Sequence, residues 1–194
     1  TSDVALSFVT LNLNNNKLTL GSSTSDLTVE NAITIDASTE GILTGGADLV
    51  LMSALTLSAG DVTSTGGIVS LSGGGQLSGT GELDVSGSTW GLGGDFVKSS
   101  GTLTDNQTNL ALSGNSTLTS DEALSFVTLN LNNLKLTLGS ATSDLTVTDN
   151  LTFDNSGEQI ITGLADLTLQ GGFILDNGTL SSTGGKVSFE KGAG

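Results

Sequence analysis

The sequence predicts an all-β fold: a parallel β-helix (β-solenoid) with three short strands per turn and about 20 residues per turn. Three observations predict it, namely short apolar alternation along the whole chain, apolar residues that recur about once per turn, and a long internal repeat. Helices are disfavoured, because no apolar stripe with the helical period persists and because 28 glycines interrupt the chain.

The predicted strands are short runs in which apolar residues alternate with small polar ones. Gly, Ser, Asn or Asp separate them, and alternation with a period of two is typical of a strand with one buried face. Thr at the outward positions supports this, because β-branched side chains suit a pleated surface. In chain order the clearest runs are 17–20, 26–29, 32–35, 48–51, 54–57, 68–71 and 82–85.

Three interleaved series of apolar residues define the three predicted faces. The first contains Leu11, Ile33, Leu55, Leu77, Val97 and Leu118; the second Leu27, Leu49, Val69, Trp90 and Leu110; the third Leu43, Val62, Leu83, Leu103 and Leu124. Turns stacked about 4.8 Å apart would make roughly nine turns into a rod roughly 45 Å long.

Residues 1–76 return at residues 119–194, and roughly 45 of these 76 positions are identical. A fixed internal period is typical of arrays whose units pack on their neighbours. We therefore divide the chain into one complete solenoid repeat, residues 1–118, and the start of a second copy, residues 119–194. We expect one continuous solenoid that is a fragment of a longer chain.

The phase of the two copies presents a conflict. Copies stack in phase only if 118 residues make a whole number of turns, and six turns would average about 20 residues each. The three series instead slip by one strand beyond Leu118, so that Leu129 falls on a different face from its counterpart Leu11. We attribute the slip to misassigned strands in the Asn-rich stretch from Leu6 to Leu20.

Charge and composition exclude several classes of function. Twenty carboxylates against five lysines give a formal net charge of −15, which disfavours nucleic acids and anionic membrane surfaces as partners. No apolar stretch is long enough to span a bilayer. The absence of His and Cys excludes catalytic nucleophile–His pairs and zinc sites, so we expect no enzyme. A glycosidase with two carboxylates is the one catalytic alternative.

Calcium is the one cofactor that the sequence suggests. Asp26 and Asp48 open strands about one turn apart, and their counterparts in the second copy are Asp144 and Asp166. Stacked carboxylates repel one another unless a cation lies between them. The alternative interpretation is that each Asp caps a strand entrance, with no metal.

Other polar clusters have simpler interpretations. The Asn-rich stretch 12–16 and its copy at 130–133 predict a turn or an amide ladder, with a sugar-binding patch as the alternative. Trp90 and Phe96 are the aromatic candidates for ligand contact. The Thr-Leu-Thr runs at 102–104 and 117–119 have the local pattern of an ice-binding face, but their spacing is out of step with the turn.

The strand–turn units at 75–85, 101–104 and 110–114 resemble the passenger regions of bacterial autotransporters and the filamentous-haemagglutinin-like giant adhesins. This resemblance implies a right-handed parallel β-helix, export to the cell surface, and a role as stalk, fibre or adhesin.

The sequence thus predicts a non-enzymatic structural segment of a long extracellular protein that forms a bacterial surface fibre, stalk or filament. Its expected partners are neighbouring copies of the repeat, stacked end to end, with lateral self-association into fibres as a further option. The alternative is a binding module that recognises a carbohydrate or a host receptor through one face of the solenoid.

Overall fold

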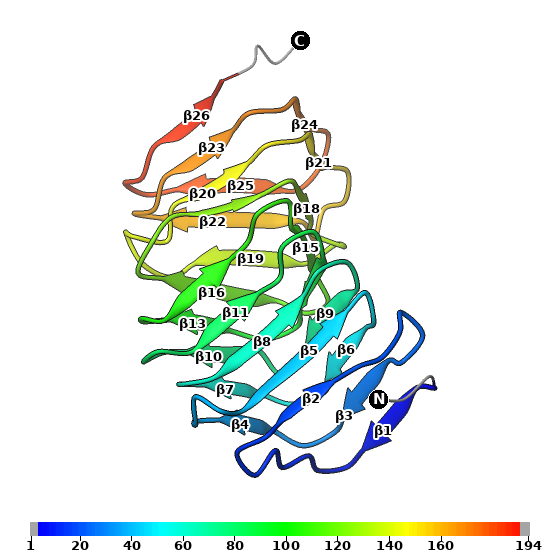
Figure 1. Ribbon diagram of the computed structural model, residues 1–194. Coiled ribbons are helices and arrows are strands. Elements are labelled where there is room, and N and C mark those ends of the chain that lie inside the picture. The colour runs from blue at the N-terminus through cyan, green and yellow to red at the C-terminus, as the bar shows by residue number, and fades with distance from the viewer. Residues whose placement is uncertain (1–3, 191–194) are drawn as a thin grey trace.

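The computed structural model describes residues 4–190, and over that range the chain is an all-β solenoid without helices (Figure 1). Parallel strands stack about 21 residues apart, three to a turn, for about nine turns. The predicted fold class is confirmed, and the turn is about one residue longer than predicted.

The strands form three faces, which the chain visits in the order A, C, B. Face A contains β1 (Leu6–Phe8), β3 (Leu27–Val29), β6 (Leu49–Leu51), β9 (Ile68–Leu71), β12 (Thr89–Leu92), β15 (Asn109–Leu112) and β18 (Thr128–Asn130), then β21 (Leu151–Phe153) and β24 (Phe173–Leu175). Face B contains β2 (Lys17–Thr19), β5 (Gly41–Gly45), β8 (Asp61–Ser64), β11 (Glu82–Asp84) and β14 (Thr102–Thr104), then β17 (Leu124–Phe126), β20 (Leu145–Val147), β23 (Leu167–Leu169) and β26 (Val187–Phe189). Face C contains β4 (Ile33–Ile35), β7 (Leu55–Leu57), β10 (Gly75–Leu77), β13 (Phe96–Lys98), β16 (Ser116–Ser120), β19 (Lys135–Leu138), β22 (Gln159–Gly163) and β25 (Thr179–Ser182).

The predicted inward column of face A is confirmed residue by residue. Leu27, Leu49, Val69, Trp90 and Leu110 are successive partners in its ladder. All five side chains are buried.

The predicted columns of the other two faces are partly wrong. On face C, Leu55 pairs with Gly75 rather than Leu77, and Val97 points outward with 38% of its surface exposed. On face B, Ile42 rather than Leu43 is the partner of Val62. Neighbouring or near-neighbouring apolar residues create the ambiguity, because a shift of one residue moves a side chain to the opposite face.

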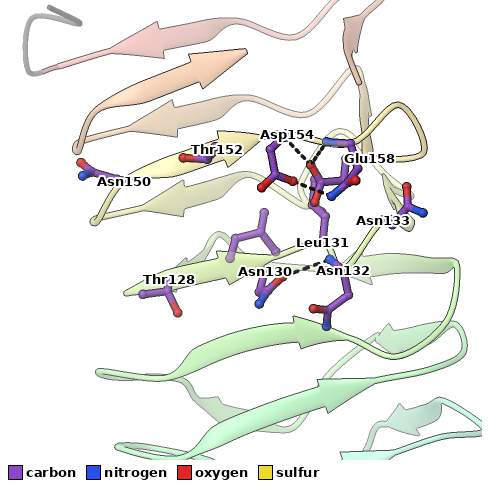
Figure 2. A pocket seen from close by; sticks show the side chains of 11 residues that line it. Thr128, Asn130, Leu131, Asn132, Asn133, Asn150, Thr152, Asp154 and Glu158 are labelled. Atoms are coloured by element: carbon purple, nitrogen blue, oxygen red, sulfur yellow. Dashed lines mark hydrogen bonds between the residues drawn. The ribbon is translucent and has the colours of Figure 1, made fainter. Parts of the chain in front are cut away.

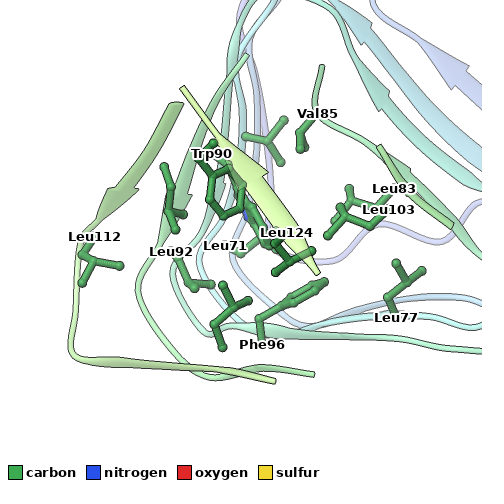
Figure 3. Close-up of a cluster of buried hydrophobic side chains, with 14 of the residues drawn as sticks. Leu71, Leu77, Leu83, Val85, Trp90, Leu92, Phe96, Leu103, Leu112 and Leu124 are labelled. Atoms are coloured by element: carbon green, nitrogen blue, oxygen red, sulfur yellow. The ribbon is translucent and has the colours of Figure 1, made fainter. Parts of the chain in front are cut away.

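Large side chains fill the middle of the core. The rings of Trp90 and Phe96 meet edge to face (Figure 3), with centroids 4.9 Å apart. The ring centroid of Phe126 lies 5.9 Å from that of Trp90. Trp90 and Phe126 are fully buried and Phe96 is 1% exposed. The suggestion that Trp90 and Phe96 contact a ligand is therefore wrong, since their bulk fills the interior where most neighbours are Leu or Val.

The second copy is rotated relative to the first. Strand β20 has the sequence position of β3, yet β3 lies on face A and β20 on face B. The same shift carries β2 on face B to β19 on face C, and β4 on face C to β21 on face A. From β3 to β20 the chain advances 17 strands, which is five and two-thirds turns. The slip seen in the sequence is thus real, and the expectation of six whole turns in phase is wrong.

One rod contains both copies. Strand β16 crosses the boundary at residue 118 and pairs with β13 before it and β19 after it. Next to this boundary the buried Lys98 ammonium lies 2.5 Å from Asp121 and 3.1 Å from Glu122. Burial alone would lower the pKa of Lys98, but the hydrogen bonds to both carboxylates outweigh it and raise that pKa. The same contact lowers the pKa of Asp121.

Candidate binding groove

The ladder of face A is interrupted between β18 and β21. The hydrogen-bonded sheet that begins at β1 ends at β18, and β21 packs beside β18 without joining it. A cavity of about 450 Å³ opens there (Figure 2). It is lined by Thr128, Leu129, Asn130, Leu131, Asn132, Asn133, Asn150, Thr152, Asp154, Asn155 and Glu158. We call it the β18–β21 groove.

A tight turn forms one end of the groove. Asn132 and Asn133 both have positive φ, 51° and 63°, and the Leu134 N–H donates to the Leu131 carbonyl across them at 2.9 Å. The Asn130 side-chain oxygen accepts from the Asn132 N–H at 3.0 Å. Asn tolerates this left-handed conformation better than other non-glycine residues, so the predicted turn in the Asn-rich stretch is confirmed.

A buried glutamate organises the opposite wall. The Glu158 side chain is 5% exposed, and its Oε2 accepts the N–H groups of Asp154 at 2.8 Å and of Asn155 at 3.2 Å. These bonds fix the loop after β21 and hold Asp154 at the mouth of the groove. Figure 2 shows Asp154 and Glu158 side by side on that wall.

The first copy contains the same groove. A cavity of about 260 Å³ lies between residues 10–12 and strand β4, lined by Thr10, Leu11, Asn12, Thr34, Asp36 and Glu40. Each of these residues is identical to a residue that lines the β18–β21 groove, 118 positions later. The turn recurs at Asn14 and Asn15, whose φ angles are 49° and 62°.

The glutamate of the first copy, Glu40, also accepts hydrogen bonds from backbone N–H groups. Glu40 accepts the N–H groups of Asn15 at 3.0 Å and of Asp36 at 3.2 Å. The N–H of Asn15, followed by those of Asp36 and Ala37, lowers the pKa of Glu40 despite its partial desolvation. This carboxylate thus joins the Asn-rich turn to the loop after β4.

Sequence reasoning missed the groove, although a signal was present. Thr34, Asp36, Ser38 and Glu40 all return in the second copy, at 152, 154, 156 and 158, while the residues between them change. A fixed polar pattern inside a variable segment pointed to a shared local structure. What the sequence could not show is that the strands on the two sides of the groove, β18 and β21, are not hydrogen-bonded to each other.

The four aspartates suggested for calcium stack as expected and bind backbone. Asp26 Oδ1 accepts the Asp48 N–H at 3.0 Å, and Asp144 Oδ1 accepts the Asp166 N–H at 2.8 Å. In turn Asp48 accepts the N–H of Ile68 at 2.8 Å, and Asp166 that of Lys186 at 2.6 Å. This is the geometry expected if each Asp caps the entrance of a strand without a metal.

Within residues 4–190 no three Asp or Glu side chains gather where they could share a metal ion. Calcium at Asp26, Asp48, Asp144 and Asp166 stays a prediction.

The groove does not have the arrangement of a glycosidase. Asp154 and Glu158 lie on one wall, four residues apart in one loop, and the side chains across from them, at residues 128–133, carry no carboxyl group. The mechanism needs two carboxyl groups on opposite sides of the scissile bond. Glu158 also uses one oxygen to hold its own loop.

The two Thr-Leu-Thr runs do not form a flat Thr surface. Thr102 and Thr104 pair with Glu82 and Asp84 of the preceding turn, and Thr119 pairs with Val97. Thr117 pairs with Thr137, but Thr137 then pairs with Ile161. Charged and aliphatic neighbours therefore interrupt the rows that an ice-binding face would need.

Comparison with known proteins identifies no relative: no protein-family model, curated protein or solved structure matches the chain. The described residues contain no helix long and apolar enough to cross a membrane.

Proposed function

We propose that this chain is a non-enzymatic structural segment of a long extracellular repeat protein, which forms a bacterial surface fibre, stalk or filament. The observation that carries the proposal is the strand ladder at the boundary between copies. Strand β16 belongs to both copies and is paired on both sides, so repeat follows repeat without a linker. Repeats joined in this way extend a rod by a fixed length each.

The last turns show what a following turn would cover. Phe189 is 48% exposed and Leu175 is 50% exposed, whereas their counterparts Leu71 and Leu57 in the first copy are fully buried. The difference arises because a further turn stacks on the first-copy residues. The same stacking would bury Leu175 and Phe189.

The surface suits an exposed fibre. The net charge of −15 keeps rods apart and in solution, and stability without cysteine comes from the ladder and the core. The resemblance to autotransporter passengers and giant adhesins supports an extracellular location at the cell surface. Neighbouring copies, end to end, are the partners that this architecture favours, and lateral contact between rods would be secondary.

Electron microscopy with helical averaging tests the proposal. A copy that advances five and two-thirds turns should rise about 27 Å along the rod. Each copy should also be turned by one face, so the same view returns only after three copies. We expect a thin fibre with this screw symmetry in the native material.

Recombinant arrays of one, two and three copies give an independent measure. Small-angle scattering should show the long dimension growing by about 27 Å per added copy at constant cross-section. Particles that grow in width, or that separate into beads joined by flexible linkers, would refute the proposal.

A further inference from the structure

In the strand that leads into the groove loop, the exposed residues are kept between the copies, whereas the buried ones differ. Thr34 and Asp36 are exposed and reappear unchanged as Thr152 and Asp154. At the buried positions of these strands, Ile33 and Ile35 of the first copy are replaced by Leu151 and Phe153 in the second. Core packing does not require the exposed pair to be kept, because these side chains do not fill the interior. Their chemistry at the groove is therefore the next question.

The groove offers hydrogen-bond donors as well as acceptors. The side-chain oxygens of Asn130, Asn133 and Asn150 already accept the N–H groups of Asn132, Gly157 and Gly172, at 3.0, 3.0 and 2.7 Å. Their NH₂ groups make no hydrogen bond to the described residues, so three amide donors are available to a ligand.

Hydrogen-bond acceptors line the same groove. The carboxylate of Asp154 and the hydroxyls of Thr128 and Thr152 line it together with these amides. A ligand whose groups both donate and accept hydrogen bonds could use both sets, and each sugar hydroxyl is such a group.

Cations and anions fit less well. Calcium takes six to eight oxygen ligands, often carboxylates, and only two carboxylate side chains, Asp154 and Glu158, are among the described residues that line the groove. Here the three Asn oxygens and one oxygen of Glu158 are already bonded to backbone N–H groups. Anionic ligands would be repelled by Asp154 and Glu158, because no lysine is among the described residues that line the groove.

We propose that the β18–β21 groove binds a neutral oligosaccharide, with Asp154 and the amides of Asn130 and Asn150 as the recognising groups. Because no aromatic side chain lines the described groove, sugar rings gain no stacking and each site is weak. An array would compensate by presenting many such sites, turned by one face from copy to copy. The site is independent of the rod proposal, since a rod needs no ligand.

The two copies provide a matched comparison. Asn150 and Asn155 of the second copy correspond to Ala32 and Ala37 of the first. The first-copy groove therefore lacks two amides and is smaller, about 260 Å³ against about 450 Å³. The second copy should bind more tightly, and the Ala residues show which substitutions the fold tolerates.

The test is an NMR titration of the ¹⁵N-labelled chain with β-1,4-linked trisaccharides of glucose, N-acetylglucosamine and mannose. At least one of them should shift the side-chain amide signals of Asn130 and Asn150 and the backbone signals around Thr152. The double variant Asn150→Ala/Asn155→Ala should weaken binding about tenfold, which corresponds to the loss of one to two hydrogen bonds. Asp154→Asn should weaken it similarly.

Controls separate recognition from folding and from metal binding. Gln76→Ala, on an exposed position of face C away from the groove, should leave binding unchanged. Circular dichroism and thermal melting confirm that each variant is folded. No shift with any of the three sugars, or equal shifts in the double variant, would overturn the proposal. So would CaCl₂ alone producing the same shifts. None of these results would alter the length of the rod, which tests the structural role separately.

Discussion

The copy that opens the chain and the copy that closes it share the polar side chains of their turns and differ at a few inward-facing positions of their cores. Both keep the Asn-rich turn, the buried glutamate and the aspartates that cap strand entrances. Inside, Ile35, Leu55 and Leu71 of the first copy become Phe153, Phe173 and Phe189 in the second. The ring of Phe173 lies 5.8 Å from that of Phe153 and 5.3 Å from that of Phe189, so at these three inward positions the second copy is aromatic where the first is aliphatic.

This difference shows which residues specify a solenoid turn. The position of each corner depends on a few polar side chains that bind particular backbone groups, and these recur. The interior needs apolar residues of suitable total volume, and different combinations fill it. A residue's contribution to stability should therefore depend on its place in the stack as much as on its identity.

The largest expected effect is a difference in unfolding free energy between alanine substitutions of two residues that occupy the same position in the repeat. Phe126 is fully buried against Trp90, whereas its counterpart Phe8 is 38% exposed. Phe126→Ala should cost about 3–5 kcal/mol of unfolding free energy, because it leaves a cavity. Phe8→Ala should cost only about 1 kcal/mol, since less apolar area is lost. Denaturant unfolding followed by Trp90 fluorescence measures both, and equal losses would contradict the role of stacking.

A smaller effect concerns a pair of changes between the copies. The Lys17 Nζ lies 2.7 Å from the Asp61 Oδ1, and Gly41 lies between the two residues in the strand ladder. A Cβ at Gly41 would come within 2.6 Å of the Asp61 carboxylate. The second copy has Gln159 and Thr179 at the positions of Gly41 and Asp61. Gly41→Gln should destabilise the chain by about 1–3 kcal/mol through overpacking.

Adding Asp61→Thr to the Gly41→Gln variant should restore part of that stability. Thermal melting of both single variants and of the double variant completes the cycle. Strictly additive effects would show that the two sites change independently.

The shared turn should respond in nearly the same way in both copies. Asn14→Ala and Asn132→Ala each place alanine at positive φ, which costs about 1–2 kcal/mol. The second should cost more, because the Asn132 side chain also donates to the Leu112 carbonyl at 2.6 Å. Glycine at either position should cost less than alanine, since it adopts positive φ freely. A tolerated alanine would contradict the importance of the turn.

The smallest expected effects are on the pH dependence of stability. The pKa of Glu40 is lowered from its ordinary 4.5, so its contribution is present above that pH and is lost as pH falls through the lower folded-state value. Burial raises the pKa of Asp105 above 3.8, although the Ser125 N–H partly opposes this. Protonation of Asp105 therefore raises the free energy of unfolding of the protein, and ionisation of Asp105 lowers it.

Melting temperatures between pH 7 and pH 3 distinguish the two groups. Glu40→Gln should flatten the loss of stability at the acid end. Asp105→Asn should raise the melting temperature at neutral pH and have little effect once the native carboxyl is protonated. Parallel curves for both variants and the parent would contradict the opposite signs.

Much of the solenoid could be predicted because its signal is local and repeated. The column from Leu27 to Leu110 follows from apolar residues one turn apart, with a single inward choice in each strand. Face C was harder, because Gly75 takes an inward place that a larger residue was expected to fill. The rotation between copies was visible as a slip, and only the assumption of stacking in phase hid its meaning.

The groove could not be predicted because it arises from missing hydrogen bonds. Residues 128–130 and 151–153 each have an ordinary strand pattern, and composition does not reveal whether two such strands pair. The turn between them could be predicted from Asn132 and Asn133. The role of Glu158 depends on where its carboxylate lies in space, which the repeat alone suggests but does not determine.

The rotation between copies also affects how a rod of this protein would carry load. The ladders are interrupted before β4 on face C, between β14 and β17 on face B and between β18 and β21 on face A. Because each copy is turned by one face, a longer array would carry such interruptions on all three faces. Gaps confined to one side would make the rod bend easily in that direction. Distributed over three sides in turn, they give a fibre that resists bending equally in every direction.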